Sequence, residues 1–197
     1  MKMKDNNEIT LKIIGKMEDF KKNLIEKGYE TSGNFILYDV YMIPKNLDIQ
    51  RMTIRDIISK SIIIRKVDDF YNNEIRNDVV YKTKEYDENG DIISQNSIRM
   101  RIMDPNDGIK LFESIGYKKL MIITEEDFVY SNGDISIATK NIKDGDNLIE
   151  VEARFNTKYS TLDELKKYLK NEELSLDFSN CFVKKAEIEL SKIMNRS

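Results

Sequence analysis

Short segments in which polar and apolar residues alternate recur along this chain of 197 residues. Successive side chains of a β-strand point to opposite faces, so this alternation predicts strands with one apolar and one polar face. Asn-Gly pairs at 89–90 and 132–133 are typical of hairpin turns between antiparallel strands. The predicted strands span residues 8–13, 34–42, 61–67, 79–86, 97–103, 120–130, 134–140 and 148–155.

Four other segments carry apolar residues at helical spacing. Gly28 and Gly116 follow two of them, and glycine readily adopts the left-handed conformation that ends a helix. A third segment begins with the capping-box spacing of Thr161 and Glu164. The predicted helices span residues 15–28, 104–116, 160–170 and 179–194.

Helix, glycine stop and following strand occur twice in the sequence. LIEKGY at 24–29 is similar to FESIGY at 112–117, and LYDVY at 37–41 is similar to EDFVY at 126–130. Two copies of a strand-helix-strand unit can close into one barrel. We therefore expect an α+β fold in one domain of residues 1–197. It would be an eight-stranded antiparallel β-barrel or tunnel with helices packed outside, built from two pseudo-repeated halves.

Composition excludes several kinds of chemistry. The chain has no histidine, so catalytic triads and histidine-ligated zinc are impossible, and Cys181 is its single cysteine. A net charge of −3 argues against general nucleic-acid binding. No apolar run is long enough for a membrane span, and the first ten residues lack a signal region, so we expect a cytoplasmic protein without a membrane partner.

The polar faces of the predicted strands carry charges of both signs. A face in contact with water is the more common reason for such a pattern. In a closed barrel whose apolar faces turn outward, however, the same side chains would line a tunnel where acids bind metal and bases bind an anion. The charged residues concerned are Glu8, Lys12, Arg65, Lys82, Arg99, Arg101, Glu150 and Glu152.

This ordered set resembles the CYTH superfamily, the triphosphate tunnel metalloenzymes. These include class IV adenylate cyclases, thiamine triphosphatases and inorganic tripolyphosphatases. Glu8 and Lys12 match the opening E-x-E-x-K motif, and Glu150 and Glu152 match the closing E-x-E motif. The resemblance extends over nearly the whole chain and implies an eight-stranded antiparallel tunnel that holds a triphosphate.

The resemblance also implies a role for each charged residue. Glu8, Glu150 and Glu152 would bind Mg²⁺ or Mn²⁺, and the phosphate ligands would be Lys12, Arg65 and Lys82, assisted by Arg99 and Arg101. The implied function is a divalent-metal-dependent phosphohydrolase or an adenylate cyclase-like enzyme. Its partner would be a small molecule with a triphosphate, such as tripolyphosphate, ATP or thiamine triphosphate. A homodimer is compatible with the sequence.

The chain departs from the family pattern at several positions. Thr10 replaces the middle glutamate of the opening motif, and Ile63 stands where an arginine is usual. TEED at 124–127 replaces K-x-R, and an expected aspartate near Ala138 is missing. The alternative is therefore a catalytically inactive CYTH-fold protein that binds a nucleotide, polyphosphate or other anion, or a protein-interaction module. Repulsion between Glu150 and Glu152 also predicts that Gln at either position stabilises the metal-free protein.

Overall fold

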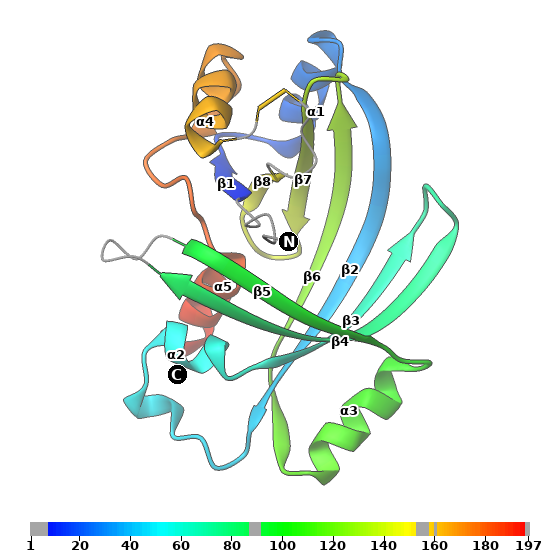
Figure 1. The fold of residues 1–197 in the computed structure, drawn as a ribbon, viewed down its shortest axis with the longest axis vertical. Helices are drawn as coiled ribbons and strands as arrows, with labels where there is room; N and C mark the ends of the chain where they lie inside the picture. Colours follow the sequence, from blue (N-terminus) through cyan, green and yellow to red (C-terminus); the bar gives the residue numbers. More distant parts are fainter. Residues whose placement is uncertain (1–7, 87–91, 153–157, 160, 196–197) are drawn as a thin grey trace, which may run out of the picture.

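One antiparallel sheet curves through the molecule in the order β5-β4-β3-β2-β6-β7-β8-β1-β9 (Figure 1). The computed structural model describes residues 8–86, 92–152, 158–159 and 161–195. The strands are β1 (Glu8–Ile13), β2 (Glu30–Pro44), β3 (Ile62–Asp69), β4 (Glu74–Tyr86), β5 (Ile92–Arg101), β6 (Tyr117–Ser131), β7 (Ser136–Ile142), β8 (Asn147–Glu152) and β9 (Leu176–Asp177). The helices are α1 (Met17–Glu26), the 3₁₀ turn η1 (Ile49–Arg51), α2 (Ile54–Ser59), α3 (Pro105–Ser114), α4 (Leu162–Asn171) and α5 (Lys185–Met194).

The two predicted halves are present as repeated helix-strand units. Helices α1 and α3 each have 10 residues, and strands β2 and β6 that follow them each have 15. Between helix and strand lie Gly28 and Gly116, with φ of +83° and +97°. This left-handed conformation favours glycine and ends each helix. Strands β2 and β6 pair antiparallel at the centre of the sheet, where the two halves meet.

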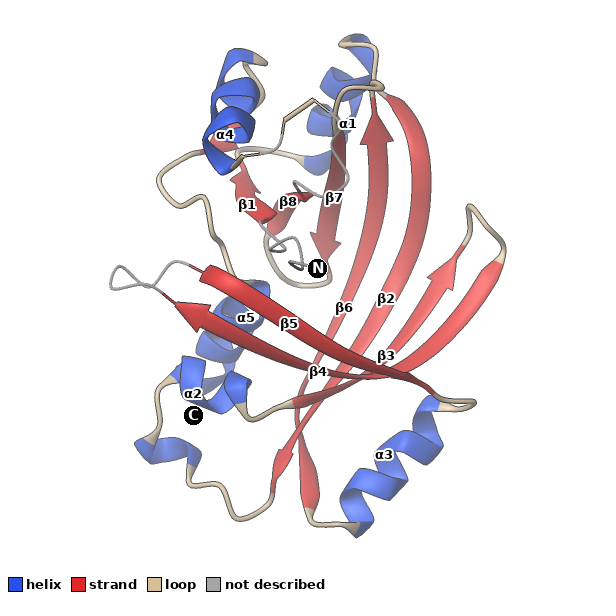
Figure 2. Cartoon of the chain, viewed as in Figure 1, coloured by secondary structure: helices blue, strands red, loops and turns tan. Residues whose placement is uncertain are grey.

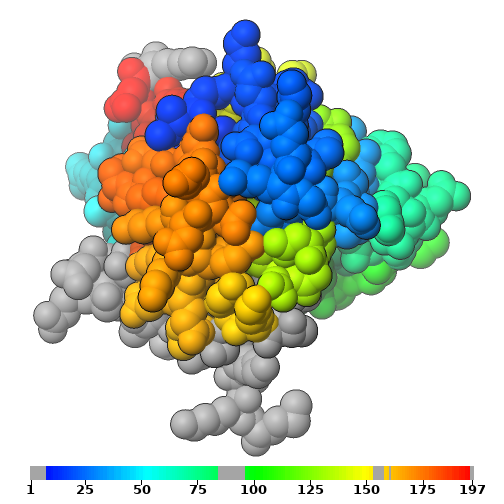
Figure 3. Space-filling model, turned by 90° about the horizontal axis from the view of Figure 1, so that it is seen from above, coloured from blue at the N-terminus to red at the C-terminus, as the bar shows by residue number. Residues whose placement is uncertain are grey.

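Helices cover much of the convex face of the sheet, as the sequence predicts. Phe20 and Leu24 of α1 and Leu165 of α4 pack on Ile9 and Leu11 of β1. Figure 3 shows the segment containing α4 beside the one containing α1 on a single face. Helix α3 covers a second group of apolar residues on β2 and β3. None of the helices in the described part of the chain is long and apolar enough to cross a membrane.

The concave face is not polar along its whole length, which the sequence reasoning missed. Tyr41 of β2 and Ile63 of β3 form an apolar cluster there with Ile57 of α2 and Leu190 of α5. Helices α2 and α5 therefore lie against the concave side, away from α3 (Figure 2). Of the predicted helices, α5 lies inside the curve of the sheet rather than outside, and it lies beside α2, a helix that the sequence analysis did not predict. Apolar inner side chains need a partner at this end of the sheet.

The predicted α+β antiparallel fold is confirmed, but the sheet of described residues has nine strands and does not close. Strand β9 pairs with β1 at Lys12 and Ile13, and further along the same edge the backbone of Thr10 bonds Cys181 and Val183. The edge of β1 that would have to meet β5 is therefore occupied by the chain's own C-terminal segment. The predicted turn at 87–91 and the end of the last predicted strand, 153–155, lie outside the described residues.

Candidate metal and anion site

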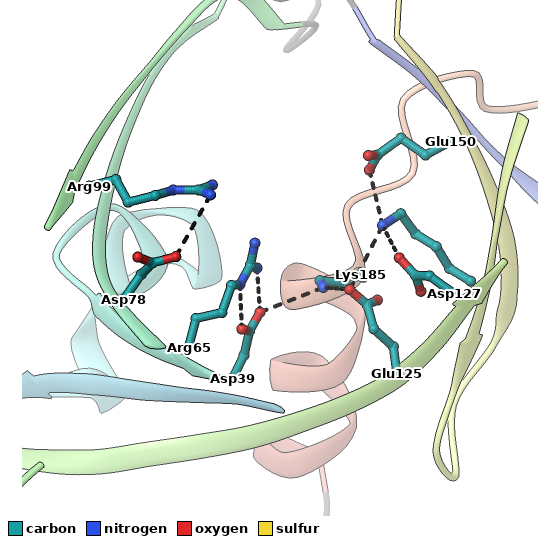
Figure 4. Close-up of polar contacts among 9 residues, drawn as sticks. Asp39, Arg65, Asp78, Arg99, Glu125, Asp127, Glu150 and Lys185 are labelled. Atoms are coloured by element: carbon teal, nitrogen blue, oxygen red, sulfur yellow. Dashed lines mark hydrogen bonds and ion pairs between the residues drawn. The ribbon is translucent and has the colours of Figure 1, made fainter. Parts of the chain in front are cut away.

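A row of alternating charges crosses four strands on the concave face. Asp39 on β2 lies opposite Arg65 on β3, which lies opposite Asp78 on β4, which lies opposite Arg101 on β5. Residues directly opposite on antiparallel strands share a face, so these side chains are neighbours. Arg101 Nε lies 3.3 Å from Asp78, and Arg99 reaches the same carboxylate at 3.8 Å (Figure 4).

Asp39 and Asp78 are the buried acids of this row, and Asp39 pairs with Arg65. Arg65 donates from Nε and Nη2 to the two Asp39 oxygens, each at 2.6 Å, and Asp39 is only 1% exposed. Burial raises the pKa of the Asp39 carboxyl, but the charges of Arg65 and Lys185 outweigh it and lower this pKa to about 2. A bidentate pair of this kind is strong and directional. The structure thus shows Arg65 already engaged by a carboxylate.

A second buried cluster lies on the neighbouring strands. Lys140 Nζ on β7 is 2.9 Å from Asp127 Oδ2 and 3.8 Å from Glu125 Oε1, both on β6. Lys185, the first residue of α5, donates to Glu125 and lies 3.7 Å from Asp39 (Figure 4). Lys185 therefore connects the two clusters, and the helix that carries it is held against the sheet by charge as well as by apolar packing.

The two β6 carboxylates of this cluster differ in proton affinity. Burial raises the pKa of Glu125, but Lys140 and Lys185 outweigh it and lower this pKa to about 2. Burial raises the pKa of Asp127 to about 6 although Lys140 opposes the rise, and the negative charge of Glu125 adds to it. Desolvation thus prevails at Asp127, which pairs with Lys140, and loses at Glu125, which pairs with both Lys140 and Lys185.

Glu8, Glu150 and Glu152 converge where β1 meets β8. Glu8 lies directly opposite Glu152, and Glu150 is the next inward residue on β8. One carboxylate oxygen from each lies within 4.8 Å of the other two, and all three side chains are half-buried. Lys140 Nζ is 3.6 Å from Glu150. Three carboxylate oxygens at this spacing suit a hard divalent cation such as Mg²⁺ or Mn²⁺.

A cavity of about 130 Å³ opens beside these carboxylates. Strands of the sheet contribute Glu8, Glu150, Lys82 and Lys140, and the first turn of α5 contributes Lys185. The α5 N-terminus adds the positive end of a helix dipole to these lysines. Other parts of the wall are apolar, with Tyr41, Ile58, Ile63, Leu148, Phe182 and Val183. The cavity therefore offers carboxylates and cations side by side.

No family model matches the chain, and no curated protein does. Solved structures do match. The PH1819 protein of Pyrococcus horikoshii OT3 is similar with TM-score 0.65 and 17% identity, over 94% of this chain and 99% of that one. A candidate adenylate cyclase of Vibrio parahaemolyticus is similar with TM-score 0.58 and 14% identity, over 95% of this chain and 99% of that one. A candidate adenylyl cyclase of Hippeastrum with a dominant triphosphatase activity is similar with TM-score 0.55 and 12% identity, over 87% of this chain and 90% of that one.

The chain therefore shares its fold with these structures, two of which belong to classes that the CYTH resemblance implies. At identities of 12–17%, the similarity establishes the fold alone. The reaction must be argued from the side chains. Of the residues predicted from the CYTH resemblance, the structure brings Glu8, Glu150 and Glu152 together and places Lys82 in the wall of the adjoining cavity.

Three other predicted phosphate ligands lie away from this cavity. Lys12 is exposed, bonds Asp146 at 3.0 Å and borders a separate hollow. Segment 181–183 bonds to the backbone of Thr10, and its residues Phe182 and Val183 line both hollows. This segment therefore separates the hollow at Lys12 from the cavity at Glu8 and Glu150. Arg99 and Arg101 are half-exposed on edge strand β5 and pair with acids there. The cavity therefore holds fewer bases than the resemblance implies.

The structure also explains the departure at TEED. Glu125 and Asp127 point inward, so a wall expected to be basic is acidic, and Lys140 on the next strand compensates. Sequence reasoning missed these three residues, together with Asp39 and Lys185. The Asn-Gly turn at 132–133 was a usable signal, because a hairpin around it pairs Ser131 with Ser136 and hence Asp127 with Lys140.

Proposed function

We propose that this protein hydrolyses a triphosphate-containing small molecule with the help of Mg²⁺ or Mn²⁺. The observation that carries the proposal is the convergence of Glu8, Glu150 and Glu152 within 4.8 Å beside a lysine-lined cavity. The likeness to a protein with triphosphatase activity supports it. Phosphoryl transfer depends mainly on positioning and charge neutralisation, so the absence of histidine is no obstacle.

The residues around the cavity would have different roles. Glu8, Glu150 and Glu152 would hold the divalent ion, which when bound neutralises phosphate oxygens and orients them. Lys82 of β4, in the cavity wall, would neutralise further phosphate charge. The apolar part of the wall would exclude bulk water from the terminal phosphate and strengthen these charge interactions. Arg65 would act indirectly, by holding Asp39, which in turn lies 3.7 Å from the cavity residue Lys185.

A second function has an observation in its favour. The bases Arg65, Lys140 and Lys185 are each paired with a buried acid, so three cations are partly neutralised before any anion arrives. A descendant of the CYTH-like fold that binds a nucleotide, polyphosphate or other anion without turning it over would show this arrangement. It would keep the acid cluster and lose catalytic efficiency.

Incubation with tripolyphosphate, ATP and thiamine triphosphate, each with Mg²⁺ or Mn²⁺, separates the two functions. We expect release of inorganic phosphate that stops when EDTA is added and is abolished in Glu152→Gln. Pyrophosphate together with cyclic AMP would instead indicate a cyclase. If no product forms but triphosphate raises the melting temperature, the binding function is correct and the hydrolase is ruled out.

The setting of this activity follows from the same proposal. The partner is a small molecule rather than a nucleic acid, because the chain carries a net charge of −3. We place the reaction in the cytoplasm, where nucleotides and Mg²⁺ are abundant. A homodimer stays a prediction from the sequence.

A further inference from the structure

Lys140 holds its ammonium group among three carboxylates. Its Nζ lies 2.9 Å from Asp127, 3.6 Å from Glu150 and 3.8 Å from Glu125. The residue is only 8% exposed, and its neighbours on the flanking strands are Asp127 and Leu148. An ammonium surrounded by oxygen atoms on three sides occupies the position that a bound cation would take.

Two of these carboxylates each have a second oxygen, which is not the one nearest Lys140. Glu125 Oε2 and Asp127 Oδ1 are buried and have no hydrogen-bond partner in the described part of the chain. Glu125 is 1% exposed and Asp127 is completely buried. A buried carboxylate oxygen without a partner is costly, and a cation with several coordination positions could satisfy both.

The cage and the proposed metal site share one ligand. Glu150 belongs to the cluster with Glu8 and Glu152, and it also faces Lys140. A second divalent ion cannot occupy the cage while the ammonium is there, because two cations would be only a few ångströms apart and would compete for the same oxygens. Lys140 thus controls how many metal ions the cavity can accept.

We infer that Lys140 is a built-in cation that takes the place of a second divalent ion. In its absence, Glu125, Asp127 and Glu150 form a second metal site next to the first. The inference rests on the proposed function only for the first site, at Glu8, Glu150 and Glu152. The lysine is a positioning residue: it holds Glu150 and sets the metal stoichiometry without touching substrate.

Calorimetric titration with Mn²⁺, in the absence of substrate, tests this inference. The wild type is expected to bind one ion, and Lys140→Met two, because the substitution removes the charge and keeps the length of the side chain. Lys140→Arg retains the charge and should bind one ion. Lys143→Met, on an exposed residue three positions away, is the matched control and should also bind one.

The melting temperature provides a second measurement if Lys140→Met is unstable. Three uncompensated carboxylates lower its stability without metal, and Mn²⁺ should then raise its melting temperature by more than that of the wild type. One ion per chain in Lys140→Met, with wild-type affinity, would overturn the inference, and so would a variant that stays unfolded at saturating Mn²⁺. If the wild type binds no ion but Lys140→Met binds one, the proposed function fails and the inference stands.

Discussion

Asp127 carries a buried carboxyl whose raised pKa sets it apart from Asp39 and Glu125, whose pKa values are lowered. The three share the concave face and differ in how many cations lie near. Burial favours the neutral form of all three carboxyls, so attraction to nearby cations and repulsion from nearby acids together decide the direction of each pKa shift. At the residue scale, the contributions of Asp127 and Asp39 to stability therefore depend on pH in opposite directions.

Asp127→Asn is expected to stabilise the protein at pH 7 to 8. The folded-state pKa of Asp127 is about 6 against an ordinary 3.8, so the folded state binds the proton more tightly. Stability contributed by Asp127 therefore falls as pH rises between these two values and stays low above them. The variant should gain about 1–3 kcal/mol at pH 8 and nothing near pH 4. Urea denaturation in EDTA across this range measures it, and a gain independent of pH would contradict the assignment.

Asp39→Asn should have the opposite effect. The pKa of Asp39 is lowered to about 2, so its stabilising contribution is full above pH 4 and is lost as pH falls toward 2. The substitution also leaves Arg65 buried without its carboxylate, which costs about 3–5 kcal/mol at pH 7. Asp134→Asn, on a half-exposed residue, is the control and should cost about 1 kcal/mol or less. Equal losses in the two variants would show that the buried pair has no special weight.

Glu150 illustrates where a sequence argument about charge gives the wrong sign. Repulsion from Glu152 predicts that Glu150→Gln stabilises the metal-free protein. The structure places Lys140 Nζ 3.6 Å from Glu150. Burial raises the pKa of Glu150, but the charges of Lys140 and Lys82 outweigh burial and lower this pKa. The ionised form is therefore favoured in the folded state, and Glu150→Gln should destabilise it.

At the scale of elements, the sequence analysis did not predict α2 or β9, and it predicted α5 without the face of the sheet on which α5 packs. The amphipathic pattern of 179–194 predicts a helix, of which residues 185–194 are helical, but that pattern cannot tell the convex face from the concave face. Leu190 packs with Tyr41 and Ile63 inside the curve of the sheet, and Lys185 bonds Glu125 in the same region. Helix α5 thus forms the end of the cavity and supplies part of its charge.

Leu190→Ala should therefore destabilise the fold and disturb the cavity. Leu190 is 1% exposed, and removal of a buried leucine side chain costs about 2–5 kcal/mol. Ile193→Ala on the same helix is the matched control, because Ile193 is 43% exposed and its loss should cost about 0.5 kcal/mol. Unfolding followed by circular dichroism measures both. Similar costs in the two variants would argue that α5 does not pack as described.

At the scale of the whole molecule, alternation in the sequence predicts most of the sheet. It places Glu8, Glu150 and Glu152 on one face and Ile9 and Val151 on the other, which the structure confirms. Two long-range features could not be predicted this way. The edge of β1 is taken by a segment about 170 residues later in the chain, and the pairing of Asp39 with Arg65 depends on strand register rather than on local pattern.

The cavity likewise depends on the whole molecule. Its glutamates come from β1 and β8, its lysines from β4, β7 and α5, and part of its apolar wall from β2 and β3. Resemblance to a family identified the acid cluster from two short motifs. It overstated the number of available bases, because a motif does not show that Arg65 is paired with Asp39 or that Lys12 lies beyond segment 181–183.

Calorimetric titration of Mn²⁺ into the wild type and Glu152→Gln tests the central claim most directly. Glu126→Gln is the control, because Glu126 lies on the same strand as Glu125 but on the opposite face of the sheet. We predict saturable binding in the wild type and in Glu126→Gln, and a loss of at least about tenfold in affinity in Glu152→Gln, which removes one charged ligand. Equal Mn²⁺ affinity in all three proteins would contradict a metal site at Glu8, Glu150 and Glu152.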